Sequence, residues 1–528
     1  FGMRKISRKL VDGYYKMCLN NEVLFQMGPL DQGFWPDGIY TAPTDEALRF
    51  DIEKTKAFGF NMIRKHIKVE PQRWYYWCDK LGMLVWQDMP SMNSYIDTRL
   101  RPVPPREDEA YIRELEAMVK THMNSPSIVS WVVFNEYQGA HAESFVVQQT
   151  KSWDASRLVN VGSGGPFNDA SDIRDFHNYP SPASPDKRNE QILVCGEYGG
   201  VGYYEQGHIW SEGNPYETVN SHEKLLERYS LYGDMLVYFK SNKGLSAGVY
   251  TEITDVEMEL NGLMTYDRKV IKGNTEDFYA VNQRIINEYR YYTDIVSTSE
   301  ETAQNWKYTT TQPSSNWLTS GFDDSAWTNG AGGFGTTGTP GAIIGTEWKT
   351  NNIWLRRKFT LPANALDTGA LMLKVHHDEA CQVYINGVKA LELTGYTGGY
   401  AFYDITPAAR AALIPGGENT LAVHCSQTTG GQYIDVGFSI MILSQPNAVK
   451  ELKKKALNIY PNPAKDILNI ERQQPDIEIA GIYNVMGKLV KSPGVSDSVI
   501  DLSDMAKGVY FLRVKTGGSY DTLAFIKK

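Results

Sequence analysis

The chain has 528 residues, which is enough for roughly two to four domains. Its net charge of −9 and the lack of a long basic run argue against nucleic acid as a partner. Five scattered cysteines without metal-ligand spacing indicate neither a disulfide framework nor a zinc site, and no apolar run is long enough to span a membrane.

Strand-like and helix-like segments alternate over the first part of the chain. Strands are predicted at residues 23–27, 60–64, 83–88, 127–136, 158–161, 173–179, 191–197 and 245–251. Helices are predicted from Thr44, which is suited to be an N-cap, and at 71–81, 107–122 and 218–241. Eight such βα units predict a (β/α)8 TIM barrel over residues 1–297. A doubly wound sheet is the alternative, but no Gly-rich phosphate loop follows the first strand.

The predicted strand at 127–136 is a continuous apolar run that ends abruptly in Asn135 and Glu136. Such a run is typical of a strand buried on both faces of a parallel sheet. In a TIM barrel the carboxyl ends of the strands carry the chemistry, so Glu136 is a candidate general acid. A solvated glutamate at a strand end is the structural alternative.

Polar and aromatic side chains also lie at the ends of other predicted strands. They are Arg64, His66, Trp86, Asp88, His177, Tyr179, Glu197 and Tyr250. Each one alone has a structural explanation, such as a hydrogen-bonded core histidine or a buried tyrosine. One barrel presents all of them on a single rim, so we expect them to form a substrate pocket together with Asn135 and Glu136.

Glu136 and Glu197 end the fourth and seventh predicted strands, on opposite sides of the barrel mouth. Retaining glycoside hydrolysis needs one carboxylic acid to protonate the leaving oxygen and a second carboxylate, about 5 Å away, to attack the anomeric carbon. The acid should have a raised pKa, and the attacking group should stay ionised. Arg64 is placed to keep Glu197 charged, and Asn135 to hydrogen-bond a sugar hydroxyl.

Several motifs resemble glycoside hydrolase family 2, the family of β-galactosidases, β-glucuronidases and β-mannosidases. They are residues 61–66, 74–85, 130–136, 196–200 and 250–257. The resemblance implies a retaining exo-β-glycosidase, with Glu136 as acid/base and Glu197 as nucleophile. No acidic cluster in the sequence indicates a catalytic magnesium site, so no metal or cofactor is expected. Tyr179 matches a tyrosine that hydrogen-bonds the nucleophile in this family.

The chain departs from the family pattern in several places. The family has a jelly-roll and an immunoglobulin-like domain before the barrel, and Phe1–Arg4 matches the end of the second, so we expect the sequence to be a fragment that continues upstream. Trp86–Pro90 is closer to the mannosidase-like variant, and the Asn-x-Lys signature for uronates is absent. The glycone therefore stays open. A catalytically silent carbohydrate-binding or scaffold protein on a glycosidase fold is the alternative function.

Residues 300–445 lose the helix patterns and contain many short alternating strands with Gly-rich turns. They predict a jelly-roll β-sandwich that resembles galactose-binding-like domains. A sugar-binding module and a structural spacer are both open. The run His376–Glu379 is unsuited to a joint metal site, because neighbouring strand residues point to opposite faces.

Residues 446–456 predict a linker, and residues 457–528 predict a small immunoglobulin-like β-sandwich. The start Tyr460-Pro461-Asn462-Pro463 and the strand Gly508–Val514 resemble the C-terminal sorting domain of the type IX secretion system of Bacteroidetes. This resemblance implies export to the cell surface or the medium, with the type IX secretion machinery as a partner beside the carbohydrate substrate.

Overall fold

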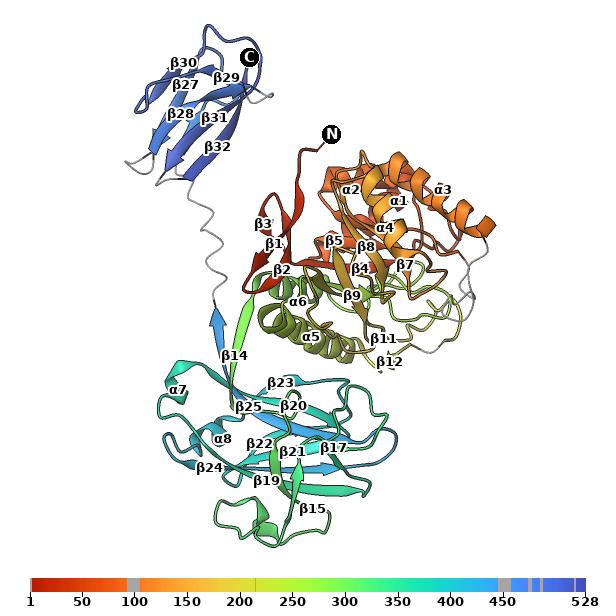
Figure 1. Ribbon diagram of the computed structural model, residues 1–528, viewed down its shortest axis with the longest axis vertical. Coiled ribbons are helices and arrows are strands. Elements are labelled where there is room, and N and C mark those ends of the chain that lie inside the picture. Colours follow the sequence, from red (N-terminus) through yellow and green to blue (C-terminus); the bar gives the residue numbers. More distant parts are fainter. Residues whose placement is uncertain are drawn as a thin grey trace. The chain divides into compact units, whose positions relative to one another are not determined.

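The computed structural model describes residues 2–92, 105–213, 215–444, 457–472, 477–484, 488–516 and 519–528. The chain forms two compact units, Phe1–Ser444 and Gln445–Lys528 (Figure 1). The predicted linker at 446–456 lies outside the described residues. No helix among the described residues combines the length and the apolar character needed to cross a bilayer.

Eight strands of the first unit form a barrel-like parallel sheet. They are β4 (Gln26–Asp31), β5 (Met62–Lys65), β6 (Leu84–Asp88), β7 (Ile128–Asn135), β8 (Leu158–Ser163), β9 (Ile173–His177), β10 (Ile192–Gly199) and β13 (Ala247–Thr251). Backbone ladders run from β9 through β10, β13, β4, β5, β6 and β7 to β8. At the remaining seam, between β8 and β9, Asn160 Nδ2 and Ser163 Oγ each donate to Asp175 Oδ2 over 2.7 Å. Side chains therefore help to close the ring where the ladder stops.

Helices follow six of these strands among the described residues. They are α1 (Asp45–Ala57), α2 (Gln72–Leu81), α3 (Pro105–His122), α4 (Glu143–Trp153), α5 (His222–Tyr238) and α6 (Thr275–Asn287). Thr44 caps α1 as predicted, because its side chain accepts from the Ala47 N–H. The prediction of eight complete βα units is wrong at β8 and β9, which are followed by loops. Gly164-Gly165-Pro166 and three prolines between 180 and 185 disfavour helices there.

A hairpin that was not predicted covers the amino ends of the barrel strands. It consists of β1 (Ile6–Val11) and β2 (Tyr14–Leu19), and a short β3 (Glu22–Val23) pairs with β2. Tyr15 pairs with Ile192 at the start of β10, and Met17 is buried in the interior cluster with Val129 and Ala247. Because this end is filled, the carboxyl ends of the strands form the open mouth of the barrel.

Lys240 is a buried lysine near the amino end of the barrel, in a single π-turn (Phe239–Lys243) after α5. Its Nζ donates to the carbonyls of Ile285 and Ile286 at the end of α6. Burial lowers the pKa of Lys240 from 10.5 to about 7. Between these pH values the unfolded chain binds more protons than the folded one, so this group makes the free energy of unfolding rise with pH.

The expected slope from Lys240 is up to about 1.4 kcal/mol per pH unit between pH 7 and 10. We expect the wild type to become more stable relative to Lys240→Met as the pH rises through this window. Denaturant unfolding measures the difference. Below pH 7 the difference in the free energy of unfolding between the wild type and Lys240→Met should stop changing with pH. Lys240 is then protonated in both the folded and the unfolded chain. A difference that is flat across the whole range would contradict the assignment.

After α6 the chain builds a two-layered β-sandwich. One sheet contains β14 (Tyr289–Val296), β17 (Phe334–Gly335), β18 (Thr346–Glu347), β20 (Ala370–Asp378), β23 (Ala401–Asp404) and β25 (Tyr433–Ser444). The other contains β15 (Asn305–Thr309), β16 (Thr328–Ala331), β19 (Asn352–Thr360), β21 (Ala380–Ile385), β22 (Val388–Leu393) and β24 (Glu418–Ser426). Short helices α7 (Ala365–Thr368) and α8 (Pro407–Ala411) lie between strands. The expected start at residue 300 needs correction, because β14 already pairs with β25.

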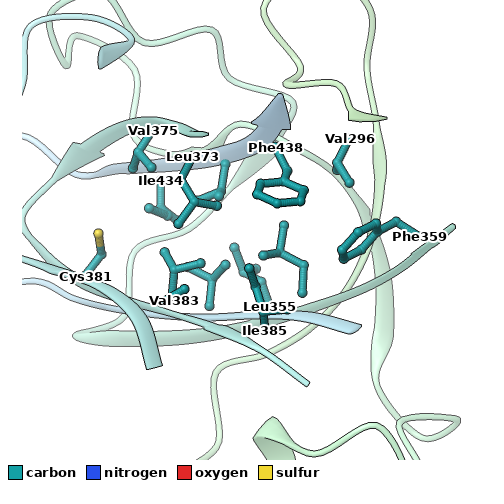
Figure 2. Packing of buried hydrophobic residues seen from close by; sticks show 14 of the residues in the cluster. Val296, Leu355, Phe359, Leu373, Val375, Cys381, Val383, Ile385, Ile434 and Phe438 are labelled. Atoms are coloured by element: carbon teal, nitrogen blue, oxygen red, sulfur yellow. The ribbon is translucent and has the colours of Figure 1, made fainter. Parts of the chain in front are cut away.

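The core of this sandwich lies between the two sheets (Figure 2). Leu373 of β20 and Phe438 of β25 face Leu355, Val383 and Ile385 of the opposite sheet, and all five are buried. Alternation along each strand sends every second side chain inward, as expected for sheets packed face to face.

The second unit is also built from two sheets. One contains β26 (Leu457–Tyr460), β27 (Ile467–Arg472) and β30 (Val499–Asp501), and the other β28 (Ile477–Asn484), β29 (Leu489–Lys491), β31 (Gly508–Thr516) and β32 (Ser519–Lys527). Leu468, Ile482, Leu512 and Phe525 form part of its own buried cluster. A separate core of this kind lets a small domain fold by itself.

Candidate active site

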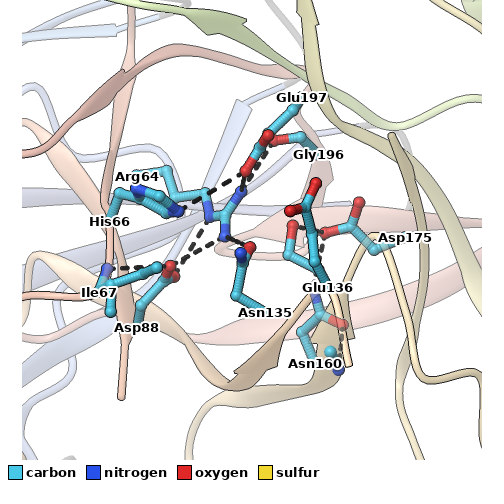
Figure 3. Close-up of polar contacts among 12 residues, drawn as sticks. Arg64, His66, Ile67, Asp88, Asn135, Glu136, Asn160, Asp175, Gly196 and Glu197 are labelled. Carbon is cyan, nitrogen blue, oxygen red and sulfur yellow. Dashed lines mark hydrogen bonds and ion pairs between the residues drawn. The ribbon is translucent and has the colours of Figure 1, made fainter. Parts of the chain in front are cut away.

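The guanidinium of Arg64 occupies the centre of the barrel mouth and is fully buried (Figure 3). Its Nη1 donates to Glu197 Oε1 at 2.8 Å and to the Gly196 carbonyl at 3.1 Å. Its Nη2 donates to Asn135 Oδ1 at 2.8 Å and to Asp88 Oδ2 at 2.9 Å. Four strands, β5, β6, β7 and β10, are thus tied to one planar cation. Because Asn135 Oδ1 accepts from Arg64, the amide NH2 of Asn135 is the group left to donate to a ligand.

Glu197 is 6 % exposed and is held from two sides. Arg64 binds Oε1, and the Tyr179 hydroxyl donates to Oε2 at 2.7 Å. The Thr251 hydroxyl lies 2.7 Å from the Tyr179 oxygen and supplies the proton of that bond, since Tyr179 uses its own for Glu197. Burial alone would raise the pKa of Glu197, but His177 and Arg64 outweigh it and hold the pKa below its usual value. The buried carboxyl is therefore ionised.

His177 lies between the two predicted catalytic carboxylates. Its Nδ1 is 2.9 Å from Glu136 Oε1 and 3.3 Å from Glu197 Oε2. Its Nε2 is 2.8 Å from Ser163 Oγ, whose own proton goes to Asp175. Both ring nitrogens thus face acceptors, an arrangement that favours the protonated ring. Burial alone would lower the pKa of His177, but Glu197 and Glu136 raise it above 6.5.

Glu136 directly follows β7 and is the more open of the two carboxylates, with 46 % of its side chain exposed. Its backbone is left-handed, with φ of 47°, a conformation that costs a non-glycine residue energy and is concentrated at functional sites. One carboxylate oxygen of Glu136 and one of Glu197 lie within 4.8 Å of each other. The hydrogen bond from His177 lowers the pKa of Glu136, so the expected raised pKa is wrong for the free protein.

His66 lies on the same rim, with Nε2 3.8 Å from Glu197 Oε1. Burial lowers the pKa of His66 to about 3, so the ring is neutral beside the cationic Arg64. Both ring nitrogens are buried, and neither has a hydrogen-bond partner with good geometry among the described residues. The substrate-binding role of His66 stays a prediction.

Two predicted substrate contacts are wrong. Trp86 is fully buried in the barrel interior and donates from Nε1 to Gln26 Oε1 at 2.6 Å. Tyr250 is fully buried in the cluster between the barrel and its helices, against Tyr198 and Tyr229. Neither side chain is accessible to a ligand. Asp88 is also buried, and it orients Arg64 rather than facing the mouth.

Several residues of the site were not predicted. They are Ser163, Asp175, Gly196 and Tyr216. Asp175 precedes His177 by two residues and so shares its strand face, a signal that the sequence does contain. Only glycine fits at position 196, because a Cβ there would lie 2.0 Å from Asp175 Oδ1. Tyr216 lies in a loop that no sequence periodicity indicates. Its ring stacks on that of Tyr179, with the ring centroids 3.7 Å apart.

One group among the described residues has a geometry that a metal ion could use: Glu136, His177 and Glu197. Within this group, His177 Nδ1 lies 2.9 Å from Glu136 Oε1 and 3.3 Å from Glu197 Oε2. The expectation of no metal stays a prediction.

Two families match parts of the sequence. Residues 41–191 match the TIM barrel domain of the glycosyl hydrolases family 2. Residues 458–528 match the secretion system C-terminal sorting domain. Glu136 lies inside the first match, whereas Glu197 lies beyond its end, so the pairing of the two rests on the structure.

Curated relatives include the β-galactosidase of Vibrio cholerae, 31 % identical over 170 residues, which are 29 % of this chain and 16 % of the relative. A putative β-glucuronidase of Formosa agariphila is 28 % identical over 172 residues, 31 % of this chain and 16 % of that protein. The chain thus spans about a sixth of the length of these relatives.

Solved structures that resemble the chain include the β-glucuronidase of Parabacteroides merdae, with 14 % identity and a TM-score of 0.39 over 98 % of this chain and 63 % of that one. The β-galacturonidase of Eisenbergiella tayi has 19 % identity and a TM-score of 0.43 over 53 % and 54 %. The family matches are regional: residues 41–191 are similar to the TIM barrel domain of glycosyl hydrolases family 2, and residues 458–528 are similar to a secretion system C-terminal sorting domain.

Proposed function

We propose that the protein is a retaining β-glycosidase that removes terminal β-linked sugars. The observation that carries the proposal is the pair Glu136 and Glu197, whose carboxylate oxygens approach within 4.8 Å. Inverting enzymes hold their carboxyl groups about 6.5–9.5 Å apart to admit a water, whereas retaining enzymes hold them about 5 Å apart. One carboxylate is buried and ionised, and the other is open to solvent, which suits two different roles.

Glu197 is the nucleophile in this mechanism. Arg64 and Tyr179 hold its two oxygens, so it attacks the anomeric carbon from a fixed position. The departing oxygen takes a proton from Glu136, and the sugar becomes covalently bound to Glu197. In the second step Glu136 removes a proton from water, which displaces the sugar from Glu197 and restores the original anomeric configuration.

The proton for the first step is held by Glu136 and His177 together. We place this proton on the imidazole in the free protein, because the pKa of His177 is raised and that of Glu136 is lowered. A shift along the 2.9 Å contact from Nδ1 to Oε1 gives a neutral acid and a neutral base without a net change in charge. His177 thus lets Glu136 act as an acid at a pH where an isolated carboxyl is ionised.

Hydrolysis of nitrophenyl β-galactosides, glucosides, mannosides, glucuronides and arabinosides tests the proposed activity. We expect turnover of at least one of them, with the β-anomer of the free sugar appearing first in proton NMR spectra. A matching 2-deoxy-2-fluoro glycoside should add its sugar mass to the peptide that contains Glu197. Release of the α-anomer would refute the mechanism. Glycan binding without any turnover would favour the alternative of a catalytically silent carbohydrate-binding or scaffold protein.

Replacing His177 by Asn is expected to narrow the pH profile of kcat/KM. Without the imidazole, the pKa of Glu136 governs the alkaline limb, which moves from above 6.5 toward the ordinary carboxyl range. The acidic limb moves up, because Glu197 loses a cation that lowers its pKa. The loss of activity should therefore be larger at pH 7.5 than at pH 5. A parallel loss at both pH values would mean that His177 acts only through structure.

We also propose that the C-terminal unit directs the chain through the type IX secretion system. The match of residues 458–528 to a sorting domain supports this route. In a host with that system, deletion of residues 458–528 should leave the protein inside the cell envelope, while the intact chain reaches the surface or the medium. Fractionation with antibody against the barrel measures the outcome. Equal export of both forms would refute this route.

A further inference from the structure

Two of the five cysteines lie directly opposite each other in the sandwich. Cys381 of β21 pairs with Cys425 of β24 in an antiparallel ladder, two residues along from the pair Val383 and Val423. Directly opposed residues project to the same face of a sheet, so both thiols point to one side. Both cysteines are free thiols in this structure.

The face that the two thiols share packs into the core of the sandwich. Buried and half-buried residues alternate along β21, and Cys381, Val383 and Ile385 are the buried ones. Cys381 and Cys425 are 2 % and 0 % exposed and belong to the same core cluster, in which Figure 2 labels Cys381. The two thiols therefore face each other across one ladder, in surroundings that exclude water.

The spacing of an antiparallel pair suits a disulfide. Directly opposed residues have Cα atoms about 4.5 or 5.5 Å apart and Cβ atoms about 4.5–5.5 Å apart. A disulfide needs Cα atoms about 4.4–6.8 Å apart and Cβ atoms about 3.5–4.5 Å apart. A small approach of the two Cβ atoms is thus enough to join Cys381 to Cys425, and the ladder between β21 and β24 can stay as it is.

The other three cysteines have no such partner. Cys18 and Cys195 lie in strands of the barrel unit, and the residues opposite them in the ladders are not cysteines. Cys78 lies on α2, a helix that contains no second cysteine. The geometry therefore singles out one pair among the five cysteines of the chain.

We propose that Cys381 and Cys425 form a cross-strand disulfide in the exported protein, and that this bond joins β21 to β24 before the core of the sandwich closes. The proposal goes beyond the glycosidase function, and it relies on the proposed export only for its oxidant. Disulfides form and persist outside the reducing cytoplasm. The oxidant is a disulfide, carried either by a thiol oxidase or by a small molecule such as oxidised glutathione.

The reaction is thiol–disulfide exchange. The thiolate of one cysteine attacks the disulfide of the oxidant and releases one of its halves as a thiol, and the thiolate of the other cysteine then attacks the mixed disulfide and displaces the second half. The two protein thiols lose two protons and two electrons, and the oxidant disulfide becomes two thiols. Burial raises the pKa of Cys381 to about 12 and that of Cys425 well above its usual value, so the folded sandwich contains almost no thiolate. The bond therefore has to form while the sandwich is still open.

The loop that this bond closes, residues 381–425, includes contacts of the sandwich with the barrel. The backbone carbonyl of Tyr396 accepts from Arg228 Nη2 on α5 at 3.2 Å. A Cβ at Gly398 would lie 2.7 Å from Ser181 Oγ, in the loop after β9. A disulfide across a loop of this length stabilises a protein mainly by restricting the unfolded chain. The oxidised chain should therefore unfold at a temperature about 3 °C or more above that of the reduced chain.

Production of the full chain in a reducing bacterial cytoplasm and in an oxidising periplasm tests the bond. The periplasmic protein should be lighter by the mass of two hydrogen atoms. Alkylation after denaturation should label every cysteine except Cys381 and Cys425, and peptide mapping should find these two linked. Cys425→Ala should abolish the mass difference. Cys18→Ala, which also removes a buried strand thiol, is the matched control and should keep it. Alkylation of all five cysteines in the periplasmic protein would overturn the proposal.

Two further measurements test when the bond forms and what it does. Oxidised glutathione added at pH 8 to the folded cytoplasmic protein should leave Cys381 and Cys425 reduced, whereas the same reagent in urea should join them. Equal oxidation in both conditions would overturn the order of events. The thermal midpoints of the cytoplasmic and periplasmic proteins, which have the same sequence, should differ by the shift given above, and equal midpoints would overturn the stabilising role.

The exported protein separates failure of the bond from failure of the export route. In a host with a type IX system, acid quenching and alkylation of the protein in the medium should find Cys381 joined to Cys425. Free thiols at both positions there would overturn the proposal. If the chain is not exported, the proposed route fails, and the periplasmic protein still judges the bond.

Discussion

Glu197→Gln is expected to abolish turnover of β-glycosides, with kcat falling by roughly four to six orders of magnitude. The amide has the shape of the carboxylate but cannot attack the anomeric carbon. The Arg64 guanidinium keeps its contacts with Asp88 and Asn135, so the fold should survive. Initial rates on the best nitrophenyl glycoside, together with a circular dichroism spectrum of the variant, measure the effect. An undiminished rate would remove Glu197 from the mechanism.

Glu136→Ala provides a contrasting variant. It removes the proposed acid/base but leaves the proposed nucleophile, so nitrophenyl substrates with good leaving groups should still form the covalent intermediate. Added azide should then restore turnover as a β-glycosyl azide, because a small anion can replace water without base assistance. Azide should give no rescue of this kind in Glu197→Gln. The same response in both variants would show that the two carboxylates do not have separate roles.

Arg64→Met is expected to cost about 3–5 kcal/mol of folding stability, the usual effect of removing one partner from a buried ion pair. Two buried carboxylates, Asp88 and Glu197, would lose their shared cation. Burial already raises the pKa of Asp88 to about 6 even with Arg64 present. The variant should therefore lose more stability at pH 8 than at pH 5, where protonation of Asp88 relieves the uncompensated charge. Urea unfolding at both pH values measures this.

Arg188→Met is the control for this stability loss. Arg188 pairs with Asp169 on the surface, where both side chains are more than half exposed, and such pairs contribute about 0–1 kcal/mol. Asp88→Asn added to Arg64→Met should recover part of the lost stability, because one buried charge is removed. A loss for Arg64→Met no larger than that for Arg188→Met would contradict the central place of Arg64 in the barrel.

In a TIM barrel, functional side chains lie at the carboxyl ends of the strands. This strand-end rule could predict the polar centre of the site, because the order of strands along the chain is enough to apply it. Arg64, Asn135, Glu136 and Glu197 each lie within two residues of the carboxyl end of a strand of buried residues, and the barrel brings such positions to one rim. The rule says nothing about the protonation of Glu136. That property depends on a histidine from another strand, whose position relative to the carboxyl is fixed only by folding.

Trp86 and Tyr250 show where the same rule needs strand geometry. Trp86 precedes Asp88 by two residues, so it points the same way but lies about 7 Å deeper in the barrel. Tyr250 precedes Thr251, which points inward to Tyr179, so Tyr250 points outward to the helices. A shift of one or two residues separates a pocket residue from a core residue, and sequence patterns locate strand ends less finely than that.

Loops account for most of what sequence patterns could not predict. Tyr216 lies in an irregular segment, and its ring stacks on Tyr179, which belongs to a different loop. The seam between β8 and β9 depends likewise on hydrogen bonds from Asn160 and Ser163 to Asp175. Such contacts have no periodicity, because each belongs to a single pair of positions.

The chain enters and leaves the sandwich at neighbouring positions. Tyr289 and Ser444 are directly paired across β14 and β25, so the two ends of this insert are neighbours in one ladder. A short peptide joining residues 288 and 445 could therefore bypass the whole insert and keep the barrel tethered to the export domain. Such an excision leaves every barrel strand intact, and it offers a direct comparison of the barrel with and without the sandwich.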